Sequence, residues 1–78
     1  MTRLRPLPYR RVARVLRRLG FVEVRQRGSH VIFQHADGRI TVVPHHAGED
    51  IGVGLLRQIV RDARVSTEAF VDERRAED

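Results

Sequence analysis

The sequence has no cysteine and no lysine, few aromatic residues and no long apolar run. Without cysteine, neither a disulfide nor a thiolate zinc site holds the fold together, so an apolar core must do so. The apolar runs are far shorter than the roughly 20 residues of a membrane-spanning helix, and none follows the basic N-terminal residues as in a signal peptide. We therefore expect a soluble, cytoplasmic protein that does not associate with membranes.

The scarcity of aromatic residues and the short length also limit the chain. The one tyrosine and three phenylalanines are too few, and too apolar in placement, to predict a surface on which nucleic-acid bases stack. So short a chain buries only about 60–65% of its surface, which predicts a single domain, residues 1–78, with one thin core. Nearly all residues from Asp72 onward are charged, so residues 71–78 are predicted to form a frayed tail.

Positive charge dominates the first half of the chain. Residues 1–39 hold ten arginines and two acids, a net charge of +8, whereas residues 40–78 hold five arginines and eight acids, a net charge of −3. This asymmetry indicates a binding face for a polyanion. All fifteen permanent cations are arginine, whose planar guanidinium grips phosphate and so suits nucleic acid. A GC-rich or thermophilic genome explains the missing lysine equally well, but it does not explain the asymmetry.

Hydrophobic periodicity and turn residues divide the chain into two main helices around three strands. Apolar residues recur at helical spacing between Pro8, which suits a first helical turn, and Gly20, a natural stop. Alternating residues, the Gly28 turn and the two-residue hairpin signal Asp37-Gly38 predict the strands. The prediction is a helix over residues 8–19, strands over Phe21–Arg27, Ser29–His35 and Arg39–Val43, a loop over 44–52, a helix over 53–63 and a short last helix capped by Ser66.

These elements predict an α+β fold in the order α-β-β-β-α, with a three-stranded antiparallel sheet, both helices on one face and a short C-terminal helix. Strict alternation along the strands defines the two faces of the sheet. The apolar face, covered by the helices, is predicted to hold Val22, Val24, Val31, Phe33, Ile40 and Val42. The open face is predicted to hold Glu23, Arg25, Arg27, His30, Gln34, Arg39 and Thr41.

His30 stands beside the Gly28 turn on this basic open face, because the apolar residues of its strand must face the core. Cleavage of RNA without a metal needs a base for the 2′-hydroxyl proton, an acid for the leaving oxygen and positive charge near the phosphorane-like transition state. An imidazole carries protons near neutral pH, and Arg25, Arg27 and Arg39 can supply the charge. His30 is thus a candidate general acid or base, and the alternative is a surface histidine without a role.

The other histidines do not predict a metal site. His30 and His35 point to opposite faces of one strand, and adjacent residues such as His45 and His46 rarely bind one ion together. No carboxylates cluster near His30 for a magnesium site, so we expect no metal and no cofactor. If the loop folds over the sheet, His45 or His46 is a candidate second proton carrier or phosphate contact. The alternative is a solvated polar loop.

Four segments of the sequence carry a resemblance to a known family. They are Leu19-Gly20-Phe21, Arg25-Gln26-Arg27-Gly28-Ser29-His30 followed by Phe33, Val42-Val43-Pro44-His45, and Gly54-Leu55-Leu56-Arg57-Gln58-Ile59. In these segments the chain resembles the HicA (YcfA-like) toxins of bacterial and archaeal toxin–antitoxin modules. The Gly-Ser-His element is the most specific part of the resemblance. The chain departs from the family pattern in having arginine where lysine is common and a second histidine, His46.

The resemblance implies a fold like the double-stranded-RNA-binding domain and the activity of a type II toxin, an mRNA interferase that cleaves mRNA independently of the ribosome. It implies that His30, the histidine of Gly-Ser-His, is the catalytic residue. RNA or phosphate contacts are expected at Arg25, Arg27, Ser29 and Arg39. A HicB-like antitoxin is the implied protein partner, covering the catalytic face. The family motif does not fix the second proton carrier, and that role stays open.

Two other functions compete with this interpretation. A non-catalytic RNA-binding module of the same fold docks phosphates through basic residues at helix ends and loops. In this chain, however, the histidine and much of the arginine are predicted to lie on the open sheet face. A small DNA-binding or partner-interaction protein is disfavoured because the chain has no helix-turn-helix pair.

Overall fold

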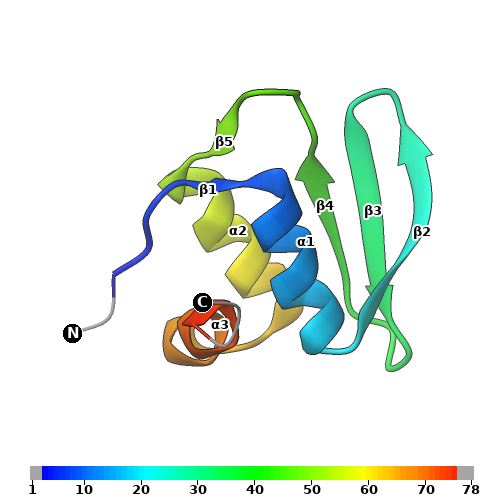
Figure 1. Ribbon diagram of the computed structural model, residues 1–78. Helices are drawn as coiled ribbons and strands as arrows, with labels where there is room; N and C mark the ends of the chain where they lie inside the picture. The colour runs from blue at the N-terminus through cyan, green and yellow to red at the C-terminus, as the bar shows by residue number, and fades with distance from the viewer. Residues whose placement is uncertain (1–2, 76–78) are drawn as a thin grey trace.

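The computed structural model describes residues 3–75, which form three helices and five strands (Figure 1). In chain order the elements are β1 (Leu7–Pro8), α1 (Tyr9–Arg18), β2 (Phe21–Arg27), β3 (His30–His35), β4 (Ile40–Pro44), β5 (Asp50–Ile51), α2 (Val53–Ala63) and α3 (Thr67–Arg75). The predicted α-β-β-β-α order and the short last helix are confirmed. The strands β1 and β5 are absent from the prediction, because two residues are too few to show a period.

The strands β2, β3 and β4 form an antiparallel sheet in that order, and the helices lie on one of its faces (Figure 1). The helix α1 packs over β2, α2 packs over β4, and α3 packs against both helices. A separate antiparallel pair, β1 with β5, sets Leu7 opposite Ile51 and ties the N-terminal segment to the residues before α2. The predicted α+β class, with a three-stranded sheet covered on one face, is therefore confirmed.

The core fills the space between the sheet and the helices. Each of these elements contributes side chains that are fully buried, and a buried aliphatic or aromatic side chain contributes about 1.5–3 kcal/mol. This apolar burial replaces the covalent links that a chain without cysteine cannot form. The largest fully buried side chains are Phe21, Phe33, Phe70, Leu16, Leu56 and Ile59.

The predicted face of β4 is wrong. Thr41 and Val43 are buried, whereas Ile40 and Val42, predicted to lie in the core, are about half exposed. Both faces of this strand carry branched side chains, so alternation alone does not decide which set is buried. The buried hydroxyl of Thr41 is satisfied by donating to the carboxylate of Asp62 on α2 at 3.1 Å. That hydrogen bond removes the cost of placing a polar residue in the core.

The predicted face of the first half of β2 is also wrong, because the strand contains a bulge. Glu23 and Arg25 lie opposite adjacent residues of β3, so Val24 is an additional residue without a partner. The bulge shifts the alternation by one residue. Phe21 therefore faces the core, while Val22 and Val24, predicted to be buried, are 59% and 50% exposed.

Glycine closes both hairpins of the sheet. The β2–β3 turn has two residues, with a positive φ of 55° at Gly28 and none at Ser29, the pattern of a type II′ turn. In the β3–β4 hairpin, the His35 N–H donates to the Arg39 carbonyl at 2.8 Å. This hydrogen bond leaves a three-residue loop with Gly38 at φ 100°, instead of the predicted two-residue turn.

The helix ends follow the predicted signals closely. The helix α1 begins at Tyr9, one residue after the predicted start, with Pro8 as its N-cap. The hydroxyl of Ser66 accepts a hydrogen bond from the Ala69 N–H at 3.0 Å, which confirms it as a cap. The helix α3 continues to Arg75 into the segment predicted to be a frayed tail, and residues 76–78 of that segment lie outside the described residues. None of the described helices has the length and apolarity to cross a membrane.

The substitutions Val42→Thr and Val43→Thr, which are nearly isosteric, test the register of β4. At the fully buried Val43, the new hydroxyl loses its hydrogen bonds to water, which lowers the free energy of unfolding by about 1–3 kcal/mol. At the exposed Val42 the hydroxyl stays hydrated, and the change is within about 0.5 kcal/mol. Urea denaturation measures both values. A greater loss at Val42 than at Val43 contradicts the register.

Candidate functional site

His30 begins β3 directly after the Gly28–Ser29 turn and points out of the open sheet face. Its neighbours across the sheet are Arg27 on β2 and Pro44 on β4. The next residue, Val31, is buried, so alternation turns the imidazole away from the core, and the His30 side chain is exposed. The imidazole is therefore accessible to a ligand on this face.

Arg25 and Arg27 share the open face with His30, as predicted, but the bulge is what makes this compatible with a buried start of β2. After the bulge, Arg25 pairs with Ile32 and Arg27 pairs with His30. Directly paired residues of antiparallel strands point to the same side of the sheet. Both arginines are exposed, so their guanidinium groups are available to a phosphate near the imidazole.

Arg39 does not join this group, and its predicted place on the open face is wrong. It lies at the β3–β4 hairpin, at the opposite end of β3 from His30 (Figure 1). Its guanidinium carbon is 5.2 Å from the centre of the Phe21 ring, and the group donates hydrogen bonds to the Ala63 carbonyl and the Asp37 carboxylate. The hydrogen bonds from Arg39 hold the pKa of Asp37 below its ordinary value. Arg39 thus ties the hairpin to α2.

Backbone hydrogen bonds hold the Gly28–Ser29 turn in place. The carbonyl oxygen of Ser29 accepts a hydrogen bond from the His45 N–H at 2.6 Å, which links the turn to the residue that follows β4. The side-chain amide of Gln26 donates to the Gly28 carbonyl at 3.1 Å. These two bonds fix the start of β3, and with it the position of His30.

His45 lies on the helix side of the same sheet end, stacked on Tyr9 of α1. The two ring centres are 3.8 Å apart and the ring planes differ by 6°. Tyr9 in turn meets the buried Phe33 ring at 6.5 Å. Because His30 pairs with Pro44, the His45 side chain leaves the strand on the opposite side from His30. The two imidazoles therefore do not face each other, and the sequence gives no sign of the Tyr9–His45 stack.

The hydroxyl of Tyr9 belongs to a small polar cluster between α1 and β2. It donates to a carboxylate oxygen of Glu23 at 3.4 Å, and Arg17 donates to the same oxygen at 2.6 Å. Burial, and then the negative charge of Glu23, raise the pKa of Tyr9, while Arg17 acts in the opposite direction. This cluster holds the ring on which His45 rests.

Away from His30, the open face is aliphatic rather than basic. Among residues 3–75, the arginines placed on this face by strand pairing, Arg25 and Arg27, lie toward the Gly28–Ser29 turn. Apart from Gln34, the remaining paired residues of this face are mainly branched and apolar. An exposed apolar patch of this kind is typical of a protein–protein contact. We call it the aliphatic face, and its exposed members are Val22, Ile40 and Val42, with the partly buried Ile32 among them.

A shallow hollow of about 320 Å³ adjoins the Tyr9–His45 pair. The end of β1, the start of α1 and the segment from the end of β4 to the start of β5 supply its walls, so it lies on the helix side of the sheet end. It mixes basic and acidic side chains. Besides the two rings it is lined by Pro8, Arg10, His46, Ala47, Gly48, Glu49 and Asp50.

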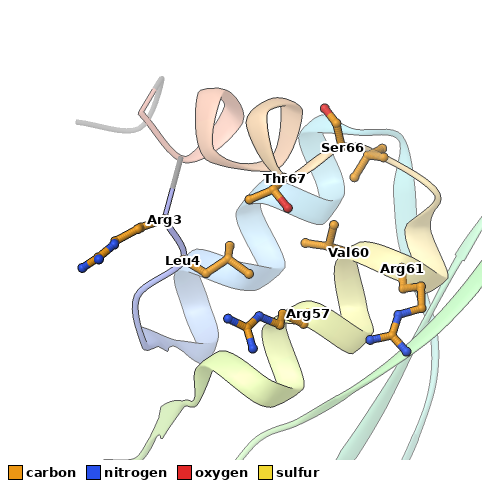
Figure 2. Close-up of a pocket in the computed structure, with 8 residues that line it drawn as sticks. Arg3, Leu4, Arg57, Val60, Arg61, Ser66 and Thr67 are labelled. Carbon is orange, nitrogen blue, oxygen red and sulfur yellow. The ribbon is translucent and has the colours of Figure 1, made fainter. Parts of the chain in front are cut away.

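A larger hollow, of about 840 Å³, lies between the N-terminal segment, α2 and the start of α3 (Figure 2). Its lining offers guanidinium and hydroxyl groups around aliphatic side chains, but no imidazole or carboxylate for proton transfer at neutral pH. The lining residues are Arg3, Leu4, Arg57, Val60, Arg61, Val65, Ser66 and Thr67. Across residues 3–75, no three histidine or acidic side chains gather closely enough to hold a metal ion.

The fold and the exposed histidine with its arginines define a small α+β protein of the double-stranded-RNA-binding-domain order. Its exposed histidine and the two arginines lie together at one end of the sheet. A family model described as the HicA toxin of bacterial toxin-antitoxin matches residues 9–65. This match covers most of the chain, so the protein belongs to the HicA toxin family and is the toxin of a toxin–antitoxin pair, with an antitoxin as partner. None of the curated proteins matches the chain.

The ionisation of Tyr9 tests the polar cluster around its hydroxyl. The chain has one tyrosine and no tryptophan, so the ultraviolet absorbance of tyrosinate reports this residue alone. The titration midpoint is expected above 10.0, and Glu23→Gln is expected to lower it by removing a negative charge. Because the folded-state pKa is raised, Tyr9 favours folding below pH 10.0, and this contribution is lost as the pH rises through the folded-state pKa. A midpoint at or below 10.0 in the folded wild type contradicts this placement.

Proposed function

We propose that the protein is a metal-independent, ribosome-independent endoribonuclease that cleaves mRNA, with His30 as general acid or base. The observation that carries the proposal is the exposed imidazole of His30 beside Arg25 and Arg27 in a chain of the HicA toxin family. The fold supports it, because a similar order of elements binds RNA through shape and phosphate contacts.

The cleavage requires a base, an acid and positive charge beside the phosphate, but no metal ion and no co-reactant. A base takes the proton of the 2′-hydroxyl, whose oxygen attacks the adjacent phosphorus. The bond from phosphorus to the 5′-oxygen breaks, and that oxygen accepts a proton from an acid. The products are a 2′,3′-cyclic phosphate and a 5′-hydroxyl. His30 fills one of the two proton-transfer roles, and its exposure to solvent supports this assignment.

Arg25 and Arg27 hold the phosphate and stabilise the charge that develops on it. Ser29 is a further contact at the turn between them and His30. Arg39 is already bonded to Asp37 and Ala63 at the far end of the sheet, so we give it no part in binding the phosphate that is cut.

We further propose that a HicB-like antitoxin covers the open face of the sheet. The aliphatic face and the catalytic histidine share this side, and an exposed apolar patch gains stability when a partner removes it from water. A partner seated there blocks access to His30 without contacting the helices.

The substitution His30→Ala tests the catalytic role. It is expected to lower the cleavage rate of single-stranded RNA by at least about 100-fold, because it removes a proton-transfer group. The measurement is the appearance of cyclic-phosphate or 3′-phosphate ends in the presence of a chelator. Gln34→Ala, on the same strand and face, is the matched control and is expected to cleave at the wild-type rate.

Two results decide against this proposal. If the His30→Ala protein cleaves RNA at the wild-type rate, His30 has no catalytic role. Binding of RNA without any cleavage by the wild type identifies a non-catalytic RNA-binding module instead.

The substitution Ile40→Asp tests the antitoxin surface. Ile40 is 51% exposed on the aliphatic face, and Leu55 on α2 is 49% exposed outside it. Ile40→Asp is expected to weaken the complex with the antitoxin encoded beside the toxin gene by about 10-fold or more, since a charge replaces a desolvated contact. Leu55→Asp is the matched control and is expected to leave the affinity unchanged. The affinities are measured by calorimetric titration. If both substitutions change the affinity for the antitoxin equally, the proposal that the antitoxin binds the aliphatic face is wrong.

A further inference from the structure

We propose that the ring of His45 is a stacking platform for one base of the bound RNA, next to the phosphate that is cut at His30. The inference rests on the proposed function and adds a subsite for a part of the substrate that the catalytic residues do not contact. It gives His45 a role other than proton carrier. Because every base has a π face, such a platform binds single-stranded RNA with little dependence on sequence.

The ring of His45 is held in place before any ligand arrives. Tyr9 covers one face of the ring at a centroid distance of 3.8 Å, while the residue as a whole is exposed. Tyr9 is itself backed by Phe33, and the backbone of His45 is tied to Ser29. A ring fixed in this way loses little conformational freedom when a base stacks on it. The tyrosine therefore supports the platform, and the histidine presents it.

The hollow beside the ring suits a base better than a phosphate. Its lining contains Arg10 and His46, but also the carboxylates of Glu49 and Asp50. Carboxylates repel phosphate, and they accept hydrogen bonds from the amino groups of bases. The guanidinium of Arg10 can donate to base carbonyl oxygens. The volume, about 320 Å³, lies at the small end of the range for ligand pockets.

The proposed platform is close to His30 in the sheet. His30 is paired with Pro44, and His45 is the next residue along the chain. The β2–β3 turn and the end of β4 lie at the same end of the sheet, the upper end in Figure 1. An RNA strand that crosses this end therefore meets His30 on the open side and His45 on the helix side. The phosphate that is cut then lies at His30 on the open side, and the neighbouring base lies at His45 on the helix side.

Binding of short RNA to the cleavage-deficient His30→Ala protein tests the platform. A single-stranded oligonucleotide with a fluorescent end is titrated with this protein and with its His45→Ala and His45→Phe derivatives. His45→Ala is expected to weaken binding by roughly 5- to 150-fold, the range for loss of one stacked base. His45→Phe keeps an aromatic ring on Tyr9 and is expected to restore most of the affinity, although it cannot carry a proton.

An abasic scan separates stacking from damage to the fold. The same oligonucleotide is made with an abasic site at each position in turn. At the position that stacks on His45, the abasic RNA is expected to bind the His45→Ala and parent proteins with equal affinity. If His45→Ala weakens the binding of every abasic RNA by the same factor, the loss of affinity comes from damage to the fold and the platform proposal is wrong.

The remaining outcomes distinguish this inference from the proposed function. If RNA is bound and cut by the wild type but His45→Ala binds as tightly as the parent, the platform fails and the nuclease stands. If, in protein that retains His30, His45→Phe is as defective in cleavage as His45→Ala while both bind RNA normally, His45 carries a proton instead. If no RNA is bound by any of the proteins, both proposals fail.

Discussion

The burial of Val31 and Phe33 is the constraint on which the site depends. Both side chains are almost completely removed from water between the sheet and the helices, and strand alternation then leaves one orientation for the residue before them. A shift of β3 by one residue would expose this apolar surface and bury His30 without a partner. The energy of the core thus holds the imidazole on the open side, and no contact to the imidazole itself is needed.

The bulge at Val24 reconciles two demands on β2. The strand starts with Phe21 in the core and ends with Arg25 and Arg27 on the open face beside His30. Strict alternation cannot produce this arrangement, because it places all four odd-numbered residues of β2 on the same face. One additional residue changes the phase between them. The bulge therefore lets a single short strand contribute to the core at one end and place two arginines beside His30 at the other.

The sequence predicts the fold and the position of His30 better than it predicts the rest of the sheet. In β3 the two faces differ clearly, so alternation identifies the buried one. In β4, Ile40 and Val42 compete with Thr41 and Val43, and the outcome depends on a hydrogen bond to Asp62, which is distant in the chain. In the same way, the Tyr9–His45 stack joins residues that are far apart in the sequence. The prediction that the chain has no surface for base stacking counts only tyrosine and phenylalanine, so it does not consider the ring of His45.

The two sides of one sheet end carry different kinds of contact, and this division bears on how a toxin of this fold is silenced. The exposed aliphatic side chains lie on the side of His30, whereas His45 and its hollow lie on the side of the helices. A partner attracted by the apolar surface is brought over the proton-transfer group and the two arginines, which are the groups on which the proposed cleavage depends. In the proposed complex, the partner gains nothing by covering the proposed base platform. Inhibition then requires only that the reacting phosphate be excluded, and the apolar surface proposed to bind the partner lies on the side that achieves this.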